Sequence, residues 1–320
     1  MKLATVLLSA LLTVGVVPTA TAQGYPNKPI RIIVPYAAGQ GTDIATRYLA
    51  ERMSKDLGQQ IIIDNRPGAG GALGTEVAAQ APGDGYTLTM GTNGTHVLNQ
   101  FLYASQRFDP EKDFEPIGLV GTFPMVLAVS SGSPLQSVAD LVAATQRDTR
   151  AADIAVPSTT ARLVVELLKE RTRVALYSVP YKGSSNAMTD VIGGQLPVII
   201  DTPTALKAQL ASRNVRAIAI TSAQPSNLLP GVRTVAEQGY PGFEVIAWNA
   251  LYAPKGTPPA IISRLNAEMT KVLARPETRD KLLELGFDPA GGSSAQLADF
   301  ARSERRKWEP LIKAAGIKAD

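Results

Sequence analysis

A short apolar run, a glycine-bearing loop and an amphipathic stretch follow one another near the start of this chain. The run is Ile30–Val34, the loop carries Gly39 and Gly41, and the amphipathic stretch is Ile44–Leu57. The pattern predicts a strand, a tight turn and a helix, because glycine permits unusual backbone angles and apolar residues recur on one helix face. The free N–H groups at such a helix start attract an anion, so we expect a phosphate or carboxylate site here.

Two side chains fit the predicted start of this helix. Thr42 is expected to cap it through its hydroxyl group, and Asp43 suits the first turn, where negative charge is favourable.

Strand-like and helix-like patterns alternate along the rest of the chain, which predicts two α/β units with mostly parallel sheets and flanking helices. The run Val245–Ala253 is a further strand that returns the chain to the first unit. We expect one domain to comprise residues 23–122 and 250–320, and the other residues 123–249. Such a bilobal, hinged protein binds its ligand between the lobes.

Two loops are expected to face the same crevice, because ligands of such sheets bind beyond the carboxyl ends of the strands. These loops are Tyr36–Thr42 and Gly91–His96. The second loop contributes four candidate ligand-binding residues, which are Thr92, Asn93, Thr95 and His96.

The N-terminus has the order of a secretory signal peptide. Lys2 precedes the uncharged apolar stretch Leu3–Val17, and Ala20-Thr21-Ala22 fits the small-residue cleavage rule. We expect cleavage after Ala22 and an exported, periplasmic protein, with a buried N-terminal helix as the alternative. The chain has no cysteine, which excludes disulfides, a thiol nucleophile and a lipid anchor on cysteine.

The charge distribution does not indicate a nucleic-acid partner. The formal net charge is +4, and the densest basic cluster, 302–307, is interrupted by Glu304. We interpret this cluster as a solvated helix face. We also expect the protein to be a monomer.

The sequence lacks the motifs that would indicate an enzyme. The pattern that begins at Gly39 would need its third nucleotide-binding glycine at position 44, which is Ile44, and there is no P-loop lysine. The only histidine is His96, no G-x-S-x-G motif is present, and the carboxylates are scattered. We therefore predict no catalytic residue, no metal and no cofactor. Asp201, at a predicted strand end, either accepts a hydrogen bond from a ligand hydroxyl or amine, or caps the helix that begins at Thr204.

An ordered set of motifs along the mature chain resembles the Bug family of periplasmic solute-binding proteins, the binding components of tripartite tricarboxylate transporters. The matching segments are 35–43 (PYAAGQGTD), 64–71 (DNRPGAGG), 84–88 (DGYTL), 179–183 (VPYKG), 193–195 (GGQ), 229–237 (LPGVRTVAE) and 253–258 (APKGTP). The resemblance implies a bilobal Venus-flytrap fold, no catalysis, a small carboxylic acid as ligand, and membrane transporter components as partners.

The resemblance also implies that backbone amides and waters from two loops hold the ligand carboxylate. The first loop corresponds to Tyr36–Asp43 here, so its candidate ligand-binding residues are Tyr36, Ala38, Gly39, Gly41, Thr42 and Asp43. Tyr181, in the motif 179–183, is a further candidate. Lys182 either contacts the anion or packs its stem along the hinge.

The second loop, 156–162 (VPSTTAR), departs from the family pattern because it lacks glycine and has Arg162 near the usual histidine. We expect the hydroxyl groups of Ser158, Thr159 and Thr160 to replace some amide contacts. Arg162 either clamps the ligand through two hydrogen bonds or points to solvent on its helix.

The predicted function is therefore capture of a small carboxylate, such as a di- or tricarboxylate, an acidic amino acid or an aromatic acid, for delivery to a membrane transporter. Two alternatives remain at this point. One is a sensor that presents the ligand to a signalling partner, and the other is an α/β enzyme that acts on a carboxylate.

Overall fold

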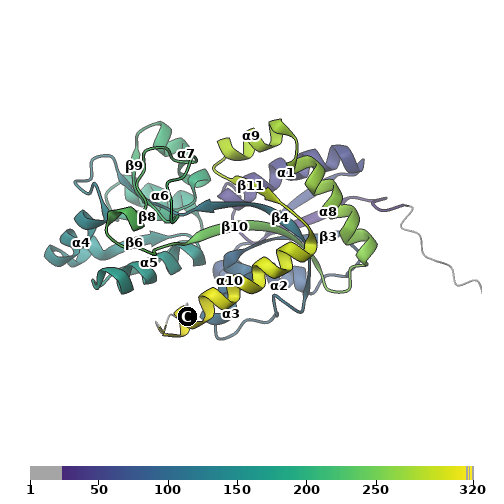
Figure 1. Cartoon of the computed structure of the whole chain (residues 1–320), viewed down its shortest axis with the longest axis horizontal. Coiled ribbons are helices and arrows are strands. Elements are labelled where there is room, and N and C mark those ends of the chain that lie inside the picture. Colours follow the sequence, from purple (N-terminus) through teal and green to yellow (C-terminus); the bar gives the residue numbers. More distant parts are fainter. Residues whose placement is uncertain (1–23, 315, 317, 319–320) are drawn as a thin grey trace, which may run out of the picture.

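The computed structural model describes residues 24–314, 316 and 318, and it contains two lobes, each built around one β-sheet (Figure 1). The predicted signal peptide, residues 1–22, lies outside the described residues. Among the helices that the structure describes, none is long and apolar enough to cross a membrane.

The first lobe contains a six-stranded sheet. Its strands are β1 (Ile30–Val34), β2 (Ile61–Asn65), β3 (Thr87–Thr92), β4 (Phe114–Pro124), β10 (Ile246–Pro254) and β11 (Asp288–Gly291). The strand order is β11-β4-β10-β3-β1-β2. β1 pairs in parallel with β2 and β3, whereas β10 runs antiparallel to β3 and β4, and β11 runs antiparallel to β4. β1 and β3 are almost entirely buried, as expected for central strands of a sheet that helices cover.

The helices of the first lobe flank this sheet. They are α1 (Gly41–Leu57), η1 (Ala69–Gly71), α2 (Ala72–Ala79), η2 (Gly94–Leu98), α3 (Asn99–Leu102), α8 (Pro259–Leu273), α9 (Pro276–Glu284) and α10 (Ser294–Ala314). α1 packs against β2 and α8, while α8 and α10 both contact β4. α1 ends where Gly58 adopts a left-handed conformation with φ 68°.

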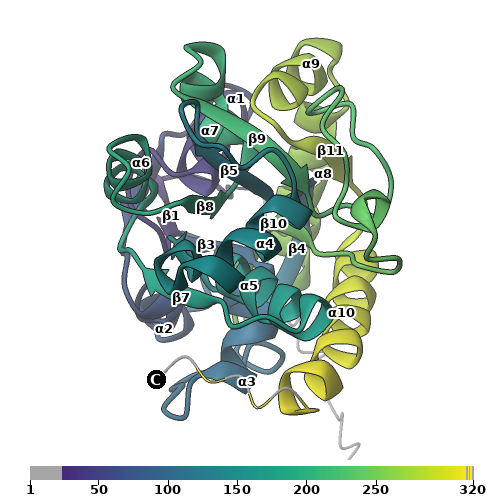
Figure 2. The ribbon, with the colours of Figure 1, turned by 90° about the vertical axis from the view of Figure 1, so that its left-hand side faces the viewer.

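The second lobe contains a five-stranded sheet (Figure 2, in which this lobe faces the viewer). Its strands are β5 (Val126–Ser130), β6 (Asp153–Val156), β7 (Tyr177–Pro180), β8 (Val198–Asp201) and β9 (Val215–Ile220), in the order β7-β6-β8-β5-β9. Its helices are α4 (Val138–Arg147), η3 (Thr149–Ala152), α5 (Thr159–Thr172), α6 (Ser184–Ile192), α7 (Pro203–Ala211) and η4 (Ala236–Gln238). β6 pairs in parallel with β7 and β8, and β5 runs antiparallel to β8 and β9.

Two long strands of the first sheet, β4 and β10, extend toward the second lobe (Figure 1). β4 leads through Met125 directly into β5, and β10 returns the chain after Val245. Thr221 joins the two crossings, because its hydroxyl group accepts a hydrogen bond from Met125 N–H (2.8 Å) and donates one to the Val245 carbonyl (2.6 Å). These residues form the connection that a hinge between the lobes would use. The predicted domain limits at 122/123 and 249/250 remain a prediction.

The sheets differ from the sequence-based expectation in one respect. The parallel units β2-β1-β3 and β7-β6-β8 are present, but antiparallel strands continue both sheets, so the sheets are mixed rather than mostly parallel. The physical reason is the crossing between lobes: β4 leaves the first lobe and β10 re-enters it, so these neighbours run in opposite directions.

Candidate functional site

The two lobes enclose a cavity at the starts of three helices, α1, α5 and α7. The cavity contains about 390 Å³ of space free of protein atoms, with open solvent at its mouth included. Its lining is formed by Tyr36, Gln40, Gly41, Thr42, Thr92, Asn93, Phe123, Met125, Ser158, Thr160, Asp201, Thr202, Ala247, Trp248 and Asn249. None of these described lining residues is a lysine, an arginine or a histidine.

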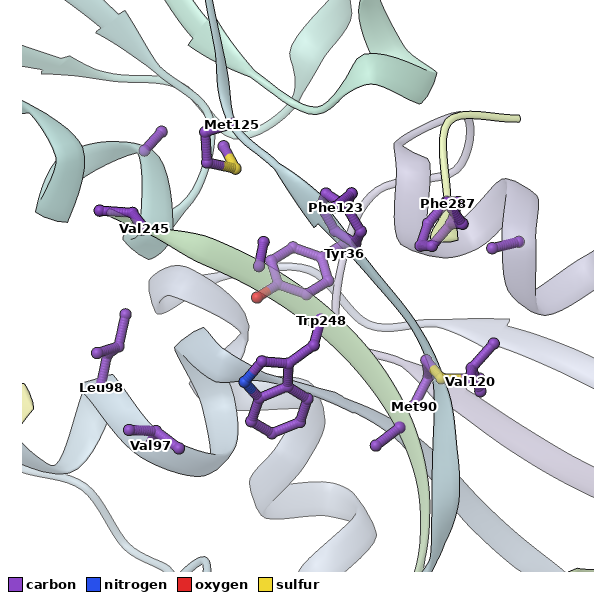
Figure 3. Close-up of a cluster of buried hydrophobic side chains, with 14 of the residues drawn as sticks. Tyr36, Met90, Val97, Leu98, Val120, Phe123, Met125, Val245, Trp248 and Phe287 are labelled. Carbon is purple, nitrogen blue, oxygen red and sulfur yellow. The ribbon is translucent and has the colours of Figure 1, made fainter. Parts of the chain in front are cut away.

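An apolar wall is provided by Phe123 and Met125, which lie on or beside the crossing strand β4 (Figure 3). Figure 3 also shows Tyr36, whose hydroxyl oxygen lies 2.9 Å from Thr92 Oγ1. Burial raises the pKa of Tyr36 to about 12, so its hydroxyl is neutral at pH 7. This wall suits the carbon skeleton of a ligand, and polar groups elsewhere in the cavity suit its charged end.

α1 begins at the cavity, one turn earlier than its apolar periodicity predicted. Gln40 is the N-cap residue and Gly41 the first helical residue. The first N–H group that bonds within the helix is that of Ile44, which donates to the Gln40 carbonyl (3.0 Å). The N–H groups of Gly41, Thr42 and Asp43 therefore precede the helical hydrogen-bond ladder and are available to an anion.

The predicted cap by Thr42 is wrong. The N-cap is Gln40, without a side-chain cap, and the Thr42 hydroxyl instead donates to Asn249 Oδ1 (3.2 Å), 207 residues away. The reason is that the helix starts before Thr42, so this hydroxyl lies inside the first turn and reaches the crossing strand β10.

Asp43 lies in the first turn as predicted, but its carboxylate is occupied by the loop itself. It accepts hydrogen bonds from the Gly39 N–H (2.9 Å), from Arg47 Nε (3.0 Å) and from Asn65 Nδ2 (2.9 Å). Gly39 adopts φ 82°, which glycine permits. Ala38, Gly39 and Asp43 do not line the cavity. They hold the shape of the loop, and the Gly39 amide is already engaged.

α5 begins at the same cavity from the other lobe. Ser158 caps it, since its hydroxyl accepts a hydrogen bond from Ala161 N–H (3.2 Å). Ser158 has an ordinary extended backbone (φ −152°, ψ 159°), so the loop needs no glycine to enter the helix. The N–H groups of Thr159 and Thr160 precede the helical ladder. The hydroxyl groups of these threonines bond to the first lobe, Thr160 to Asn93 Oδ1 (3.0 Å) and Thr159 to the Gly70 carbonyl (3.5 Å).

Two asparagine side chains add hydrogen-bond donors to the cavity. Asn93 and Asn249 are 1% and 0% exposed, and the Oδ1 atom of each accepts a threonine hydroxyl, from Thr160 and Thr42 respectively. The Nδ2 atom of each is buried without a hydrogen-bond partner among the described residues. Because an unpaired buried amide is unfavourable, these donors are expected to be used by a bound molecule.

Asp201 closes the cavity at the end of β8. Its Oδ1 accepts the Thr202 N–H (2.7 Å), and Thr202, not Asp201, caps α7 by accepting from Ala205 N–H (3.1 Å). The alternative in which Asp201 caps this helix is therefore wrong. Burial raises the pKa of Asp201 to about 6, against the opposing effect of its hydrogen bonds.

Other predicted site residues lie away from this cavity. The His96 ring stacks on Tyr252 with 4.0 Å between ring centroids, and its Nδ1 lies 2.9 Å from Thr95 Oγ1. Burial lowers the pKa of His96 to about 3, so the ring is neutral at pH 7. Thr95 in turn accepts the Thr92 N–H (3.0 Å). Thr95 and His96 therefore stabilise the loop after β3 without lining the cavity.

Thr159, Arg162, Tyr181 and Lys182 line a second cavity on the other side of Tyr36 and Ser158, together with the glycine-rich segment 67–71. The Arg162 guanidinium donates to the Lys318 carbonyl, and the Tyr181 hydroxyl donates to Asp190 Oδ2 (2.5 Å). Of the candidates from the sequence, the first cavity thus collects Tyr36, Gly41, Thr42, Thr92, Asn93, Ser158, Thr160 and Asp201. Their contact with a ligand remains a prediction.

Sequence reasoning missed several lining residues, notably Gln40, Thr202 and Asn249. A signal for Asn249 exists, because it is the only amide side chain inside the apolar run of β10 and is fully buried. Gln40 was overlooked as a neighbour of two glycines. Its side chain accepts the Ala37 N–H (3.0 Å) and reaches the Pro157 carbonyl of the other lobe (3.4 Å). Within the described part of the chain, no cluster of three or more metal-ligating side chains occurs.

Comparison with curated proteins identifies relatives of nearly full length. The UPF0065 protein in the tcbD-tcbE intergenic region of Pseudomonas sp. strain P51 is 37% identical over 291 residues, which cover 90% of this chain and 86% of that protein. Protein BugT of Bordetella pertussis is 34% identical over 311 residues, which cover 96% of this chain and 95% of BugT.

Three solved structures share the fold. Rpa4515 of Rhodopseudomonas palustris, with adipate, has a TM-score of 0.88 at 35% identity and covers 92% of this chain and 99% of its own. The periplasmic binding protein BugD has a TM-score of 0.86 at 32% identity, with coverage of 92% and 99%. MatC of Rhodopseudomonas palustris, with bound malate, has a TM-score of 0.84 at 30% identity, with coverage of 90% and 100%.

The sequence also matches the family model described as the tripartite tricarboxylate transporter family receptor, TctC, over residues 45–317. This match includes most of both lobes and the starts of α5 and α7. Members of this family are solute-binding proteins and not enzymes. With its two lobes, its cavity between them and its full-length relatives, this chain belongs to the TctC family of solute-binding proteins, which includes the Bug proteins.

Proposed function

We propose that this protein captures a small carboxylate in the cavity between its lobes and delivers it to the membrane components of a tripartite tricarboxylate transporter. The proposal places the mature protein in the periplasm, after removal of residues 1–22. It acts as a monomer whose lobes close on the ligand.

The observation that carries the proposal is the convergence of unpaired donors on one buried cavity. The first N–H groups of α1 and α5 come from opposite lobes, and Asn93 and Asn249, whose Nδ2 atoms have no hydrogen-bond partner among the described residues, line the same cavity. Helix starts bind anions through their N–H groups and dipoles. A carboxylate is a planar anion with two acceptor oxygens, so it can satisfy donors from both lobes at the same time.

Because the described lining residues include no lysine or arginine, neutral amide groups would bind the anion in this mechanism. Neutral amides bind an anion without forming a strong ion pair, so release needs less energy than it would from a buried salt bridge. Waters can bridge between the amides and acids of different length. Adipate and malate in the related structures support a carboxylate, since both are small dicarboxylic acids.

Closure of the lobes couples binding to delivery. Several hydrogen bonds join the lobes around the cavity, including Thr160 to Asn93 (3.0 Å) and Gln40 to the Pro157 carbonyl (3.4 Å). A ligand that contacts both helix starts favours this arrangement over one in which the lobes are apart. The transporter would then recognise the closed form.

The first test is a thermal-shift screen of the purified mature protein with mono-, di- and tricarboxylates, acidic amino acids and aromatic acids. A ligand that binds the native state raises the melting temperature in proportion to the logarithm of its concentration. We expect at least one acid to do so, with no conversion of that acid detected by mass spectrometry. Absence of a shift with every acid, or turnover of the acid, would contradict the proposal.

A matched pair of variants places the site. Asn249→Ala removes one amide from the cavity, whereas Asn214→Ala removes an amide from an exposed turn of the second lobe. We expect the first variant to lower the affinity about tenfold or more and the second to leave it unchanged. Delivery is tested separately, by loss of cellular uptake of the identified acid when the gene is deleted.

A further inference from the structure

Among the described residues that line the cavity between the lobes, Asp201 is the one carboxylate, and it is not part of the anion-binding donor set. It is the last residue of β8 and is 3% exposed, and its neighbour Thr202 is the N-cap residue of α7. Its Oδ1 accepts the Thr202 N–H (2.7 Å), and the Ser184 hydroxyl also hydrogen-bonds to the carboxyl group, whereas its Oδ2 has no hydrogen-bond partner among the described residues.

No cation compensates this carboxylate. The described lining of the cavity contains no lysine, arginine or histidine, and none of the described ion pairs involves Asp201. A buried acceptor oxygen without a partner is unfavourable, and a second carboxylate brought against it would add repulsion. The ligand group that meets Asp201 must therefore carry a hydrogen-bond donor.

The polar groups of the cavity are thus divided by type. Amide donors come from the starts of α1 and α5 and from Asn93 and Asn249, and the acceptor comes from Asp201 at the start of α7. The Thr42 and Thr160 hydroxyls are directed to asparagine oxygens and leave the two amide groups free to donate. A molecule that satisfies both sets has a carboxylate and, on the same small skeleton, a hydroxyl or ammonium group.

We propose that Asp201 is a specificity-determining residue, which accepts a hydrogen bond from a ligand hydroxyl or ammonium group and so selects hydroxy- or amino-substituted acids over unsubstituted ones. The inference rests on the proposed function, because it assigns one end of the ligand within the same cavity. The raised pKa of Asp201 agrees with its burial, which outweighs the opposing hydrogen bonds from Ser184 and Thr202.

The test uses acids that differ only in the donor group. Dissociation constants are measured by calorimetry at pH 7.5 for succinate, malate and aspartate, and for glutarate, 2-hydroxyglutarate and glutamate. We expect the wild-type protein to bind at least one substituted acid about tenfold or more tightly than its unsubstituted partner, because a hydrogen bond to a charged acceptor is among the stronger ones. Malate against aspartate then distinguishes a hydroxyl from an ammonium group.

The same dissociation constants are then measured for the variant Asp201→Asn. It retains the shape of the side chain and an oxygen for the Thr202 N–H, but it removes the negative charge. The preference for the substituted acid should fall to about twofold or less, while the unsubstituted acid binds as well as before or better. Asp280→Asn, the same change at an exposed position on α9, should leave the preference unchanged.

Equal affinity of the wild-type protein for all members of both series would overturn this inference and leave the proposed function intact. The same conclusion follows if Asp201→Asn keeps the full preference. If Asp201→Asn does not fold, the wild-type comparison alone decides. Failure of the wild-type protein to bind any acid of the wider screen would overturn the proposed function, and this inference with it.

Discussion

Gly41 and Thr202 meet across the two lobes so closely that a Cβ atom on Gly41 would stand 2.7 Å from the Thr202 hydroxyl oxygen. Gly41 is the first residue of α1, and Thr202 caps α7. The absence of a side chain at Gly41 therefore lets the first helix start approach the second lobe and complete the cavity.

Gly41→Ala is expected to weaken ligand binding about tenfold or more. The added methyl group also approaches Thr204 Cβ (3.2 Å), and Thr202 cannot rotate away without giving up its cap on Ala205. The melting temperature without ligand should change little, because the clash arises only when the lobes meet. Titration calorimetry measures the affinity, and Gly132→Ala, which places its methyl group in open space, is the control. Unchanged affinity would show that close approach at this point is not needed.

Thr221→Val is expected to destabilise the native state by about 2 kcal/mol, since it leaves the Met125 N–H and the Val245 carbonyl without their buried partner. Thr221→Ser keeps the hydroxyl group and should lose clearly less. The measurement is urea unfolding of the three proteins. If valine and serine had the same effect, the hydroxyl group would not be what joins the two crossings.

The ionisation of Asp201 should be visible in the pH dependence of stability. Its pKa is about 6 in the native state, above the ordinary value of about 3.9 for an unfolded chain. The native state thus binds the proton more tightly, and its stability should fall as the pH rises between about 4 and 6, then level off. Two pKa units correspond to about 3 kcal/mol.

This fall is measured as the difference in unfolding free energy between Asp201→Asn and the wild-type protein from pH 4 to pH 8, without ligand. The difference should grow in favour of the variant up to about pH 6. Parallel curves for the two proteins would refute the raised pKa.

Arg162→Ala should change the affinity for four-carbon acids by no more than about twofold, as a charge outside the binding cavity contributes little. The guanidinium lines the second cavity and donates to the Lys318 carbonyl. Arg171→Ala, at an exposed position of the same helix, controls for the loss of one positive charge. A much larger loss from Arg162→Ala would favour the alternative in which this residue clamps a ligand carboxylate.

Local patterns predicted most of the elements. The strand predicted at Ile30–Val34 is β1 with the same limits, and the strand predicted at Val245–Ala253 is β10, displaced by one residue, because strand patterns act over a few neighbours. β11 was missed. It is the short segment Asp288–Gly291, half exposed and containing proline, and it becomes a strand only by pairing with β4.

Part of the candidate site was also predictable from local sequence patterns. Gly41 and Ser158 belong to helix starts, which the sequence indicates through turn and capping residues. Which backbone N–H groups are hydrogen-bonded within the protein, and which remain available to a ligand, was not predictable. Gly39 and Gly41 look alike in the sequence, yet Asp43 takes the N–H of Gly39, while that of Gly41 remains available at the cavity.

By itself, the sequence determined the alternation of strands and helices and the family resemblance that the comparisons confirm, and it predicted an anion site at the first helix start. All of these reside in residues that are close together in the chain or in an ordered set of short motifs. Only the tertiary structure decided which polar groups remain unpaired. Thr42 with Asn249, and Thr160 with Asn93, are pairs separated by 207 and 67 residues. The first pair lies within the first lobe and the second joins the two lobes, so the unpaired Asp201 oxygen and asparagine amides emerge only from the folded chain.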